Sequence, residues 1–301
     1  MGFPYSLSPT DVEKARAHSR WLWLGGNWPK AIYPLSWLIE KFDPPGWKQP
    51  ITSENNDPVA GAVSLSPVLR KAIVYCTDNI LDEKLMLACQ KQLRIAAPGI
   101  PIVVVSLKPI DFGDVRIVMP LERGPLTLFK QLLAGFEAAD ADIIYYVDHD
   151  VLYHPSHFDI LPSSPTLFTY NQNVWQVGLE KGNALYIACR SPSGLVAYRS
   201  LLIEHFRKRV ALVEEHGFTR AMGFEPGTHN RPERVDDYWH ERQDSVLPNI
   251  DVRHKNNFTQ SRWKKEQFRN KPQAWIEARE VPGWGITEGR FSEVLDGILS
   301  L

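Results

Sequence analysis

Between residues 71 and 151, short apolar runs alternate with segments whose apolar residues are spaced three and four positions apart. The runs are rich in β-branched and aromatic residues, which predicts strands that are buried on both faces. The spaced segments predict amphipathic helices. The predicted strands are residues 72–76, 102–105, 116–119 and 143–148, and the predicted helices are residues 81–96 and 125–139. This alternation predicts an α/β fold with a mostly parallel sheet that is covered by helices on both faces.

The pattern changes on either side of this block. Residues 1–65 mix Pro and Trp with polar turns, so we expect an irregular, aromatic-rich arm. Residues 66–301 are expected to form one domain with two halves, 66–150 and 151–301. In the second half the sequence predicts strands at 166–170 and 184–188, a helix at 194–216 and a loop-rich tail.

Composition excludes several classes of protein. The 301 residues are 44% hydrophobic and 23% charged, with a net charge of −1, so no global field attracts nucleic acid or membranes. The three cysteines fit neither a disulfide framework nor a zinc site and are expected to be buried thiols. The first residues lack the pattern of a signal peptide, and no apolar run reaches the length of a membrane span. We therefore expect a cytoplasmic protein.

The predicted strand 143–148 ends in two aspartates, Asp148 and Asp150. Open α/β sheets bind ligands at the carboxyl ends of their strands, and carboxylate oxygens suit Mg²⁺ or Mn²⁺. A metal held there can in turn hold a diphosphate. In the alternative interpretation the two aspartates only cap a turn. If the strand continues, His149 points away from its neighbours and is expected to be a bystander.

Two further groups of residues are candidates for the same site. Thr77 and Asp78 end the first predicted strand, where a nucleotide would meet the sheet, although both are also good caps for the helix that follows. His254 leaves a short apolar run and can supply a further metal ligand.

The segment Gly223-Phe224-Glu225-Pro226-Gly227 fixes the backbone around one carboxylate. Glu225 is therefore a candidate general base. Asp236 and Asp237 compete for this role, and an exposed glutamate in a turn is the alternative interpretation.

Residues 72–254 resemble a GT-A glycosyltransferase, through a strand that ends in Thr-Asp, an Asp-x-Asp strand, Gly-Phe-Glu and a late Arg-His. The resemblance implies a UDP-sugar donor and an Mn²⁺ or Mg²⁺ ion. It assigns the metal to Asp148, Asp150 and His254, with Asp148 also near the donor.

The same resemblance implies that Glu225 is the catalytic base of an inverting transfer, although Pro226 replaces the second acid that commonly follows it. It also implies that Arg123 and Lys130 contact the diphosphate, and that Thr77 and Asp78 contact the nucleotide.

The acceptor is suggested by a basic segment, residues 253–271, which contains seven Lys and Arg residues and one acid. Similar enzymes of phages and kinetoplastids glycosylate hydroxymethylated bases in DNA, so such a base is one candidate acceptor. A saccharide or protein hydroxyl is the alternative. A sugar-phosphate nucleotidyltransferase ranks below these, because no Gly-rich loop follows the first strand. A carbohydrate-binding module would not explain paired acids at the end of a buried strand.

Overall fold

The computed structural model describes residues 21–23, 32–34, 68–223, 225–228, 239–268 and 272–301. The chain divides into two units, residues 1–64 and 65–301. In the first unit, strands β1 (Trp21–Trp23) and β2 (Ile32–Pro34) pair antiparallel. The two-half organisation expected for residues 66–301 stays a prediction.

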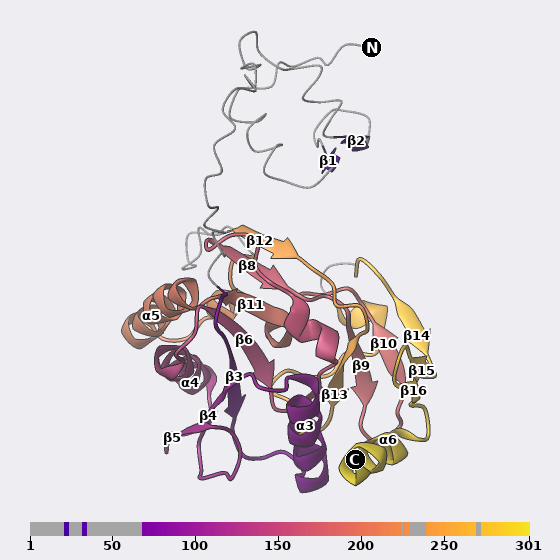
Figure 1. Ribbon diagram of the computed structural model, residues 1–301. Coiled ribbons are helices and arrows are strands. Elements are labelled where there is room, and N and C mark those ends of the chain that lie inside the picture. Colours follow the sequence, from indigo (N-terminus) through magenta and orange to yellow (C-terminus); the bar gives the residue numbers. More distant parts are fainter. Residues whose placement is uncertain (1–20, 24–31, 35–67, 224, 229–238, 269–271) are drawn as a thin grey trace, which may run out of the picture. The chain divides into compact units, whose positions relative to one another are not determined.

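A seven-stranded sheet forms the centre of the second unit (Figure 1). Its strand order is β12-β8-β11-β6-β3-β4-β5, and β11 alone runs antiparallel to both of its neighbours. The strands are β3 (Lys71–Thr77), β4 (Ile102–Ser106), β5 (Val115–Val118), β6 (Ile143–Asp148), β8 (Leu167–Tyr170), β11 (Leu195–Tyr198) and β12 (Trp239–Arg242). The predicted α/β class with a mostly parallel sheet is confirmed.

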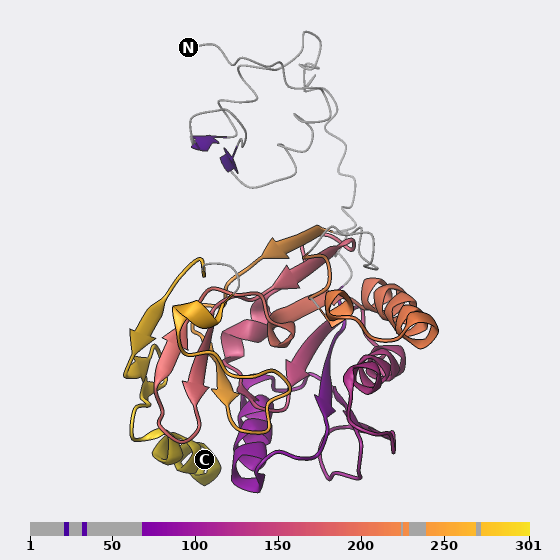
Figure 2. The same cartoon turned by 180° about the vertical axis from the view of Figure 1, so that it is seen from behind.

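Helices cover both faces of this sheet (Figures 1 and 2). Helices α4 (Pro125–Ala138) and α5 (Arg199–His216) pack on one face, and α3 (Glu83–Ala96) and the 3-10 helix η1 (Pro155–Asp159) pack on the other. Alternation along β3 explains this, because Val74 and Cys76 contact the first layer while Ile73 and Tyr75 contact the second. A strand that is apolar on both sides needs cover on both sides.

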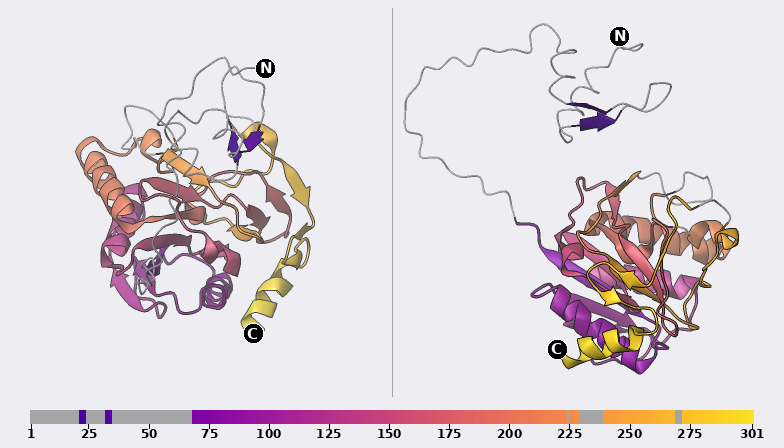
Figure 3. Two further views of the ribbon diagram at one scale, coloured as in Figure 1. Left: turned by 45° about the horizontal axis from the view of Figure 1, so that its top comes forward. Right: turned by 90° about the vertical axis from the view of Figure 1, so that its right-hand side faces the viewer.

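A second, five-stranded sheet has the order β14-β10-β9-β13-β7. Its strands are β7 (Val151–Leu152), β9 (Val174–Gly178), β10 (Ala184–Tyr186), β13 (Asn249–Arg253) and β14 (Ile276–Ala278). Helix α6 (Phe291–Ser300) lies beside α3, and the two close a core that includes Trp175, Val252 and Leu295 (Figure 3). The remaining elements are η2 (Pro192–Gly194), η3 (Arg220–Gly223), η4 (Lys265–Gln267), β15 (Glu280–Val281) and β16 (Gly285–Ile286). None of the described helices is both long and apolar enough to cross a membrane.

The start of the helix predicted at residues 194–216 is wrong. Residues 195–198 form β11, which pairs with β6 on one side and with β8 on the other, and the helix begins only at Arg199. The apolar spacing of this segment suits a helix and a short strand equally well. The segment forms a strand because it lies between β6 and β8 and satisfies backbone hydrogen-bonding groups of both.

Gly135 allows α4 to approach the sheet closely. A Cβ atom at this position would overlap Val74 and lie 3.2 Å from the Val105 Cγ2 atom. We therefore expect Gly135→Ala to lower the free energy of unfolding by about 1–3 kcal/mol through overpacking. Urea denaturation would measure this change. Gly297→Ala in α6 is the matched control, since nothing lies within 4 Å of its Cβ position, and it should stabilise by about 0.5–1 kcal/mol. Equal effects at the two positions would contradict the close approach.

Candidate functional site

The chain passes from one sheet to the other at the predicted acidic motif. Strand β6 of the seven-stranded sheet ends at Asp148, and β7 of the five-stranded sheet begins at Val151. Strand β13 pairs antiparallel with β7, and the Val252 N–H donates a hydrogen bond of 2.9 Å to the Asp150 carbonyl. This pairing brings His254 to the turn, although the two segments are about a hundred residues apart in sequence.

Three side chains meet at this turn in an arrangement that can hold a metal ion. The potential ligand atoms of His149, Asp150 and His254 all lie within 4.8 Å of one another. The Asp150 Oδ2 atom lies 3.2 Å from His254 Nε2 and accepts a 2.7 Å hydrogen bond from the Asn257 amide. His149 Nδ1 lies 2.7 Å from the Thr77 hydroxyl oxygen.

The interpretation of His149 as a bystander is therefore corrected. It assumed that the strand continues past Asp148, so that alternate side chains point to opposite faces. Strand β6 stops at Asp148, and His149 and Asp150 form a turn in which this alternation no longer holds. The sequence did carry a signal for the turn, because aspartate is common where a strand passes into a turn, as the alternative interpretation of Asp148 and Asp150 assumed.

Asp148 is not a member of this three-residue group among the described residues. Its carboxylate accepts a hydrogen bond from the Tyr146 hydroxyl, and its backbone N–H donates to the Tyr153 hydroxyl oxygen at 3.0 Å. Asp148 nevertheless lines the same pocket as His149 and Asp150. Its predicted role as a metal ligand stays a prediction.

Burial and mutual repulsion shape the charges of the cluster. Burial, followed by the charge of Asp150, raises the pKa of Asp148 to about 7. Burial also raises the pKa of Asp251 to about 6, although the Arg253 guanidinium 3.3 Å away opposes this. For Asp150, burial acts in the same direction, but the hydrogen bond from His254 and nearby positive charge lower its pKa. Of these three carboxyl groups, Asp150 is the one whose pKa is lowered, and it belongs to the metal-competent group.

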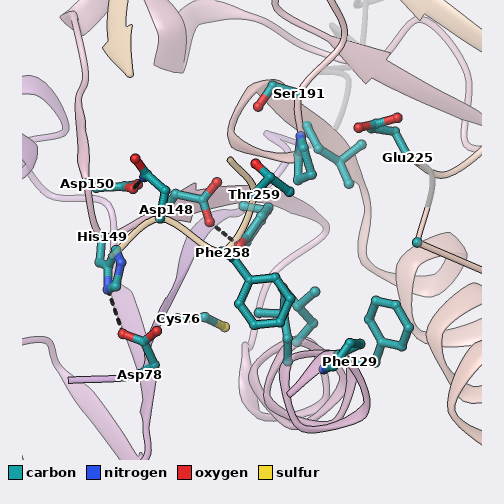
Figure 4. Close-up of a pocket in the computed structure, with 18 of the residues that line it drawn as sticks. Cys76, Asp78, Phe129, Asp148, His149, Asp150, Ser191, Glu225, Phe258 and Thr259 are labelled. Carbon is teal, nitrogen blue, oxygen red and sulfur yellow. Dashed lines mark hydrogen bonds and ion pairs between the residues drawn. The ribbon is translucent and has the colours of Figure 1, made fainter. Parts of the chain in front are cut away.

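His149 and Asp150 line a pocket of about 990 Å³, and His254 lies behind them, outside its lining. Figure 4 shows Asp148 and Asp150 on one wall and Glu225 on another. Glu225 follows η3, is half-buried, and also lines the pocket. The structure thus places the predicted base and the predicted acidic motif around one space.

Thr77 and Asp78 also line this pocket, at the end of β3. The alternative that they cap the next helix is wrong. Helix α3 begins at Glu83, and its cap is Asp82, whose carboxylate accepts a 3.2 Å hydrogen bond from the Leu85 N–H.

Arg123 lines the pocket but has several partners within the protein. Its Nε atom donates to Asp78 Oδ2 at 2.7 Å, and its Nη2 atom donates to the Asn256 carbonyl at 3.0 Å. Its guanidinium lies 4.8 Å from the centre of the Phe258 ring. Arg123 therefore ties the end of β3 to the loop that carries His254.

Lys130 is placed differently from the prediction. Its ammonium group pairs with Glu214 on α5 at 2.7 Å, and it is absent from the residues that line the pocket. A diphosphate contact of Lys130 has no support in this geometry. The competing bases Asp236 and Asp237 lie outside the described residues.

The sequence interpretation also missed Asn257, which helps to hold Asp150. Its side-chain oxygen accepts a 2.6 Å hydrogen bond from the His254 N–H while its amide donates to Asp150. An asparagine three residues after a histidine at a strand exit is a weak signal for such a turn.

No family model matches the sequence, and no curated protein matches it significantly. Solved structures similar to the chain include bifunctional IspDF from Campylobacter jejuni (13% identity, TM-score 0.35, 59% of this chain and 50% of that one). They also include the apo form of the glycosyltransferase GlyE of Streptococcus pneumoniae, with 12% identity and a TM-score of 0.35 over 57% of this chain and 45% of that one. A third is an active-site mutant of LgtC, with 13% identity and a TM-score of 0.34 over 62% of this chain and 91% of that one. The chain spans about half the length of the first two proteins.

The metal-competent group predicts the effect of removing one ligand. Loss of a residue that only orients a metal ligand typically weakens metal binding by roughly 10- to 100-fold. We expect His149→Ala, which removes a ligand itself, to weaken Mn²⁺ binding by at least this factor. Isothermal titration calorimetry would measure the affinity. His216→Ala, at the exposed end of α5, is the control and should leave it unchanged. Equal affinities of the two variants would remove His149 from the site.

The raised pKa of Asp148 predicts how stability depends on pH. The Asp148 carboxyl binds its proton more tightly in the folded state than in the unfolded state. The free energy of unfolding therefore falls as the pH rises from about 4 to about 7. Asp148→Asn removes this loss. Its stability relative to the unsubstituted protein should therefore increase between pH 5 and pH 8, measured by urea denaturation with EDTA present. Asp111→Asn, at an exposed position, should show no such trend. A constant difference for Asp148→Asn would contradict the raised pKa.

Proposed function

We propose that this chain is a metal-dependent glycosyltransferase that moves a sugar from a UDP-sugar to an acceptor hydroxyl, with inversion at the anomeric carbon. One observation carries the proposal. His149, Asp150 and His254 form a metal-competent group at the end of the central sheet, and two of them, His149 and Asp150, line the same pocket as Glu225.

The donor set fits a divalent cation. Two imidazoles and one carboxylate suit Mn²⁺ better than Mg²⁺, which prefers oxygen ligands. His149, Asp150 and His254 would hold the ion. When bound, it would supply Lewis-acid stabilisation of the charge that develops on the leaving UDP.

The strand ends beside the metal group would hold the nucleotide. Thr77 and Asp78 end β3, and Asp148 ends the neighbouring parallel strand β6. Nucleotides bind at this edge of open α/β sheets. Arg123 contributes positive charge at the same edge, and we assign no role in binding to Lys130.

Glu225 would act as the general base. Its carboxylate takes the proton of the acceptor hydroxyl as the oxygen attacks the anomeric carbon from the face opposite to UDP. One displacement of this kind inverts the configuration. The backbone next to Glu225 is fixed by a 2.7 Å hydrogen bond from the Tyr170 hydroxyl to the Pro226 carbonyl.

For the acceptor we propose a hydroxymethylated base in DNA, in preference to a saccharide or protein hydroxyl. The support is the segment that follows β13 and lines one wall of the pocket. Arg262, Lys264 and Lys265 are exposed on it, and Glu266 is the only acid among its described residues after Asp251. Such cations attract a phosphate backbone and make binding dependent on salt.

Removing the base predicts a loss of turnover without a loss of donor binding. Glu225→Gln should lower the turnover number by on the order of 10²- to 10⁴-fold, because a general base typically contributes that much. The Kd of Mn²⁺–UDP should be unchanged. Glu215→Gln, at an exposed position on α5, is the control. Full activity of Glu225→Gln would place the base elsewhere or make the transfer retaining.

The products distinguish this proposal from a nucleotidyltransferase. Incubation with a panel of UDP-sugars and Mn²⁺ should release UDP, and EDTA should abolish the release. Release of pyrophosphate from UTP and a sugar phosphate would instead favour the nucleotidyltransferase.

A further inference from the structure

Two of the residues that line the pocket are exposed phenylalanines. Among the described residues, Phe218 (45% exposed) and Phe258 (49%) are the aromatic members of the exposed large hydrophobic side chains, and both line this pocket. Exposed apolar side chains that gather at a pocket commonly mark where a ligand binds. The two rings come from different elements, because Phe218 precedes η3 and Phe258 follows β13.

Phe218 belongs to a group of aromatic residues in the pocket lining, which we call the aromatic chamber. Phe129 lies 6.2 Å from Phe218 between ring centres, and it packs edge-on against Phe206 at 6.1 Å. The guanidinium of the buried Arg209 lies 5.1 Å from the Phe129 ring and 5.3 Å from the Phe206 ring. All of these residues line the pocket. Aromatic rings therefore form this part of the lining, and such a surface suits a flat, apolar ring.

The same pocket lining also carries positive charge. Arg190, Arg220 and Arg262 also line the pocket, and none of them forms an ion pair with another described residue. Arg220 lies two residues after Phe218, and the Arg262 guanidinium stacks over Phe268 at 5.3 Å. Rings flanked by available cations match a nucleotide, in which a flat base is joined to phosphates. A pyranose would use the rings but would leave the cations without a partner.

We propose that the aromatic chamber, together with the exposed rings of Phe218 and Phe258, binds one nucleobase displaced from a DNA strand, while the arginines of the pocket lining contact its phosphates. This rests on the proposed function and specifies how the acceptor reaches Glu225. A base stacked inside a duplex cannot enter a pocket, so it must leave the stack first. Single-stranded and mismatched DNA is therefore the preferred form.

Fluorescence anisotropy with labelled oligonucleotides tests this. The probe is a short DNA strand with a central 5-hydroxymethylcytosine, used single-stranded, in a matched duplex, and in a duplex with a mismatch opposite that base. The affinity should be highest for the single strand or the mismatched duplex, and it should fall as salt is raised. Tightest binding of the matched duplex would overturn the proposal.

The ring at position 218 provides the decisive variants. Phe218→Ala should weaken binding of the single strand by roughly 5- to 150-fold, the range for loss of one stacking side chain. Phe218→Tyr keeps the ring and should restore affinity. Val246→Ala, at another exposed apolar side chain outside the pocket lining, is the matched control. Unchanged binding by Phe218→Ala, or a Phe218-dependent displacement of the probe by an oligosaccharide, would overturn the proposal.

Calorimetry of Mn²⁺ and UDP on the same samples separates the two proposals. If both ligands bind but the oligonucleotides do not, the nucleobase chamber is wrong and the transferase stands. If the oligonucleotides bind with the expected dependence on Phe218 but Mn²⁺ and UDP do not, the chamber stands and the transferase is wrong.

Discussion

The site depends on the antiparallel pairing of β13 with β7. The hydrogen bond from Val252 N–H to the Asp150 carbonyl fixes the register, and that register sets His254 beside the Asp150 carboxylate. The other end of β13 is anchored as well, because the buried Asn249 side chain accepts a 2.9 Å hydrogen bond from His154 N–H. A shift of one residue would turn every side chain of β13 to the opposite face.

The same pairing concentrates acidic groups in a place where charge is costly. Asp148, Asp150 and Asp251 converge on one pocket, and burial opposes ionisation of each. Arg253 and Asn257 offset part of this cost by pairing with Asp251 and Asp150. A divalent cation would offset the remaining cost of burying these carboxylates. This favours the proposed metal site over a purely structural network. Arg123 extends the arrangement by joining Asp78, at the end of β3, to the loop that follows His254.

Much of the fold was predictable because buried strands have a distinctive local pattern. The runs at 72–76, 102–105 and 143–148 are apolar on both faces, and each became a strand of the central sheet within one residue. The second sheet was harder to predict, because β7 is two residues long and β9 lies in a polar context. Strand β11 was hidden inside a helical pattern, and only the position between β6 and β8 decides its conformation.

The sequence by itself determined the α/β class and the presence of acids at the end of a buried strand, because strand periodicity and the polarity of a strand end are local properties. Only the tertiary structure decided which side chains surround the site. His149 joins it because the chain turns as it changes sheets, and His254 joins it through a register set by backbone hydrogen bonds. Lys130 lies outside the pocket lining, and its ammonium group pairs with Glu214 on a helix far along the chain. Each outcome depends on contacts between distant segments, which local patterns do not encode.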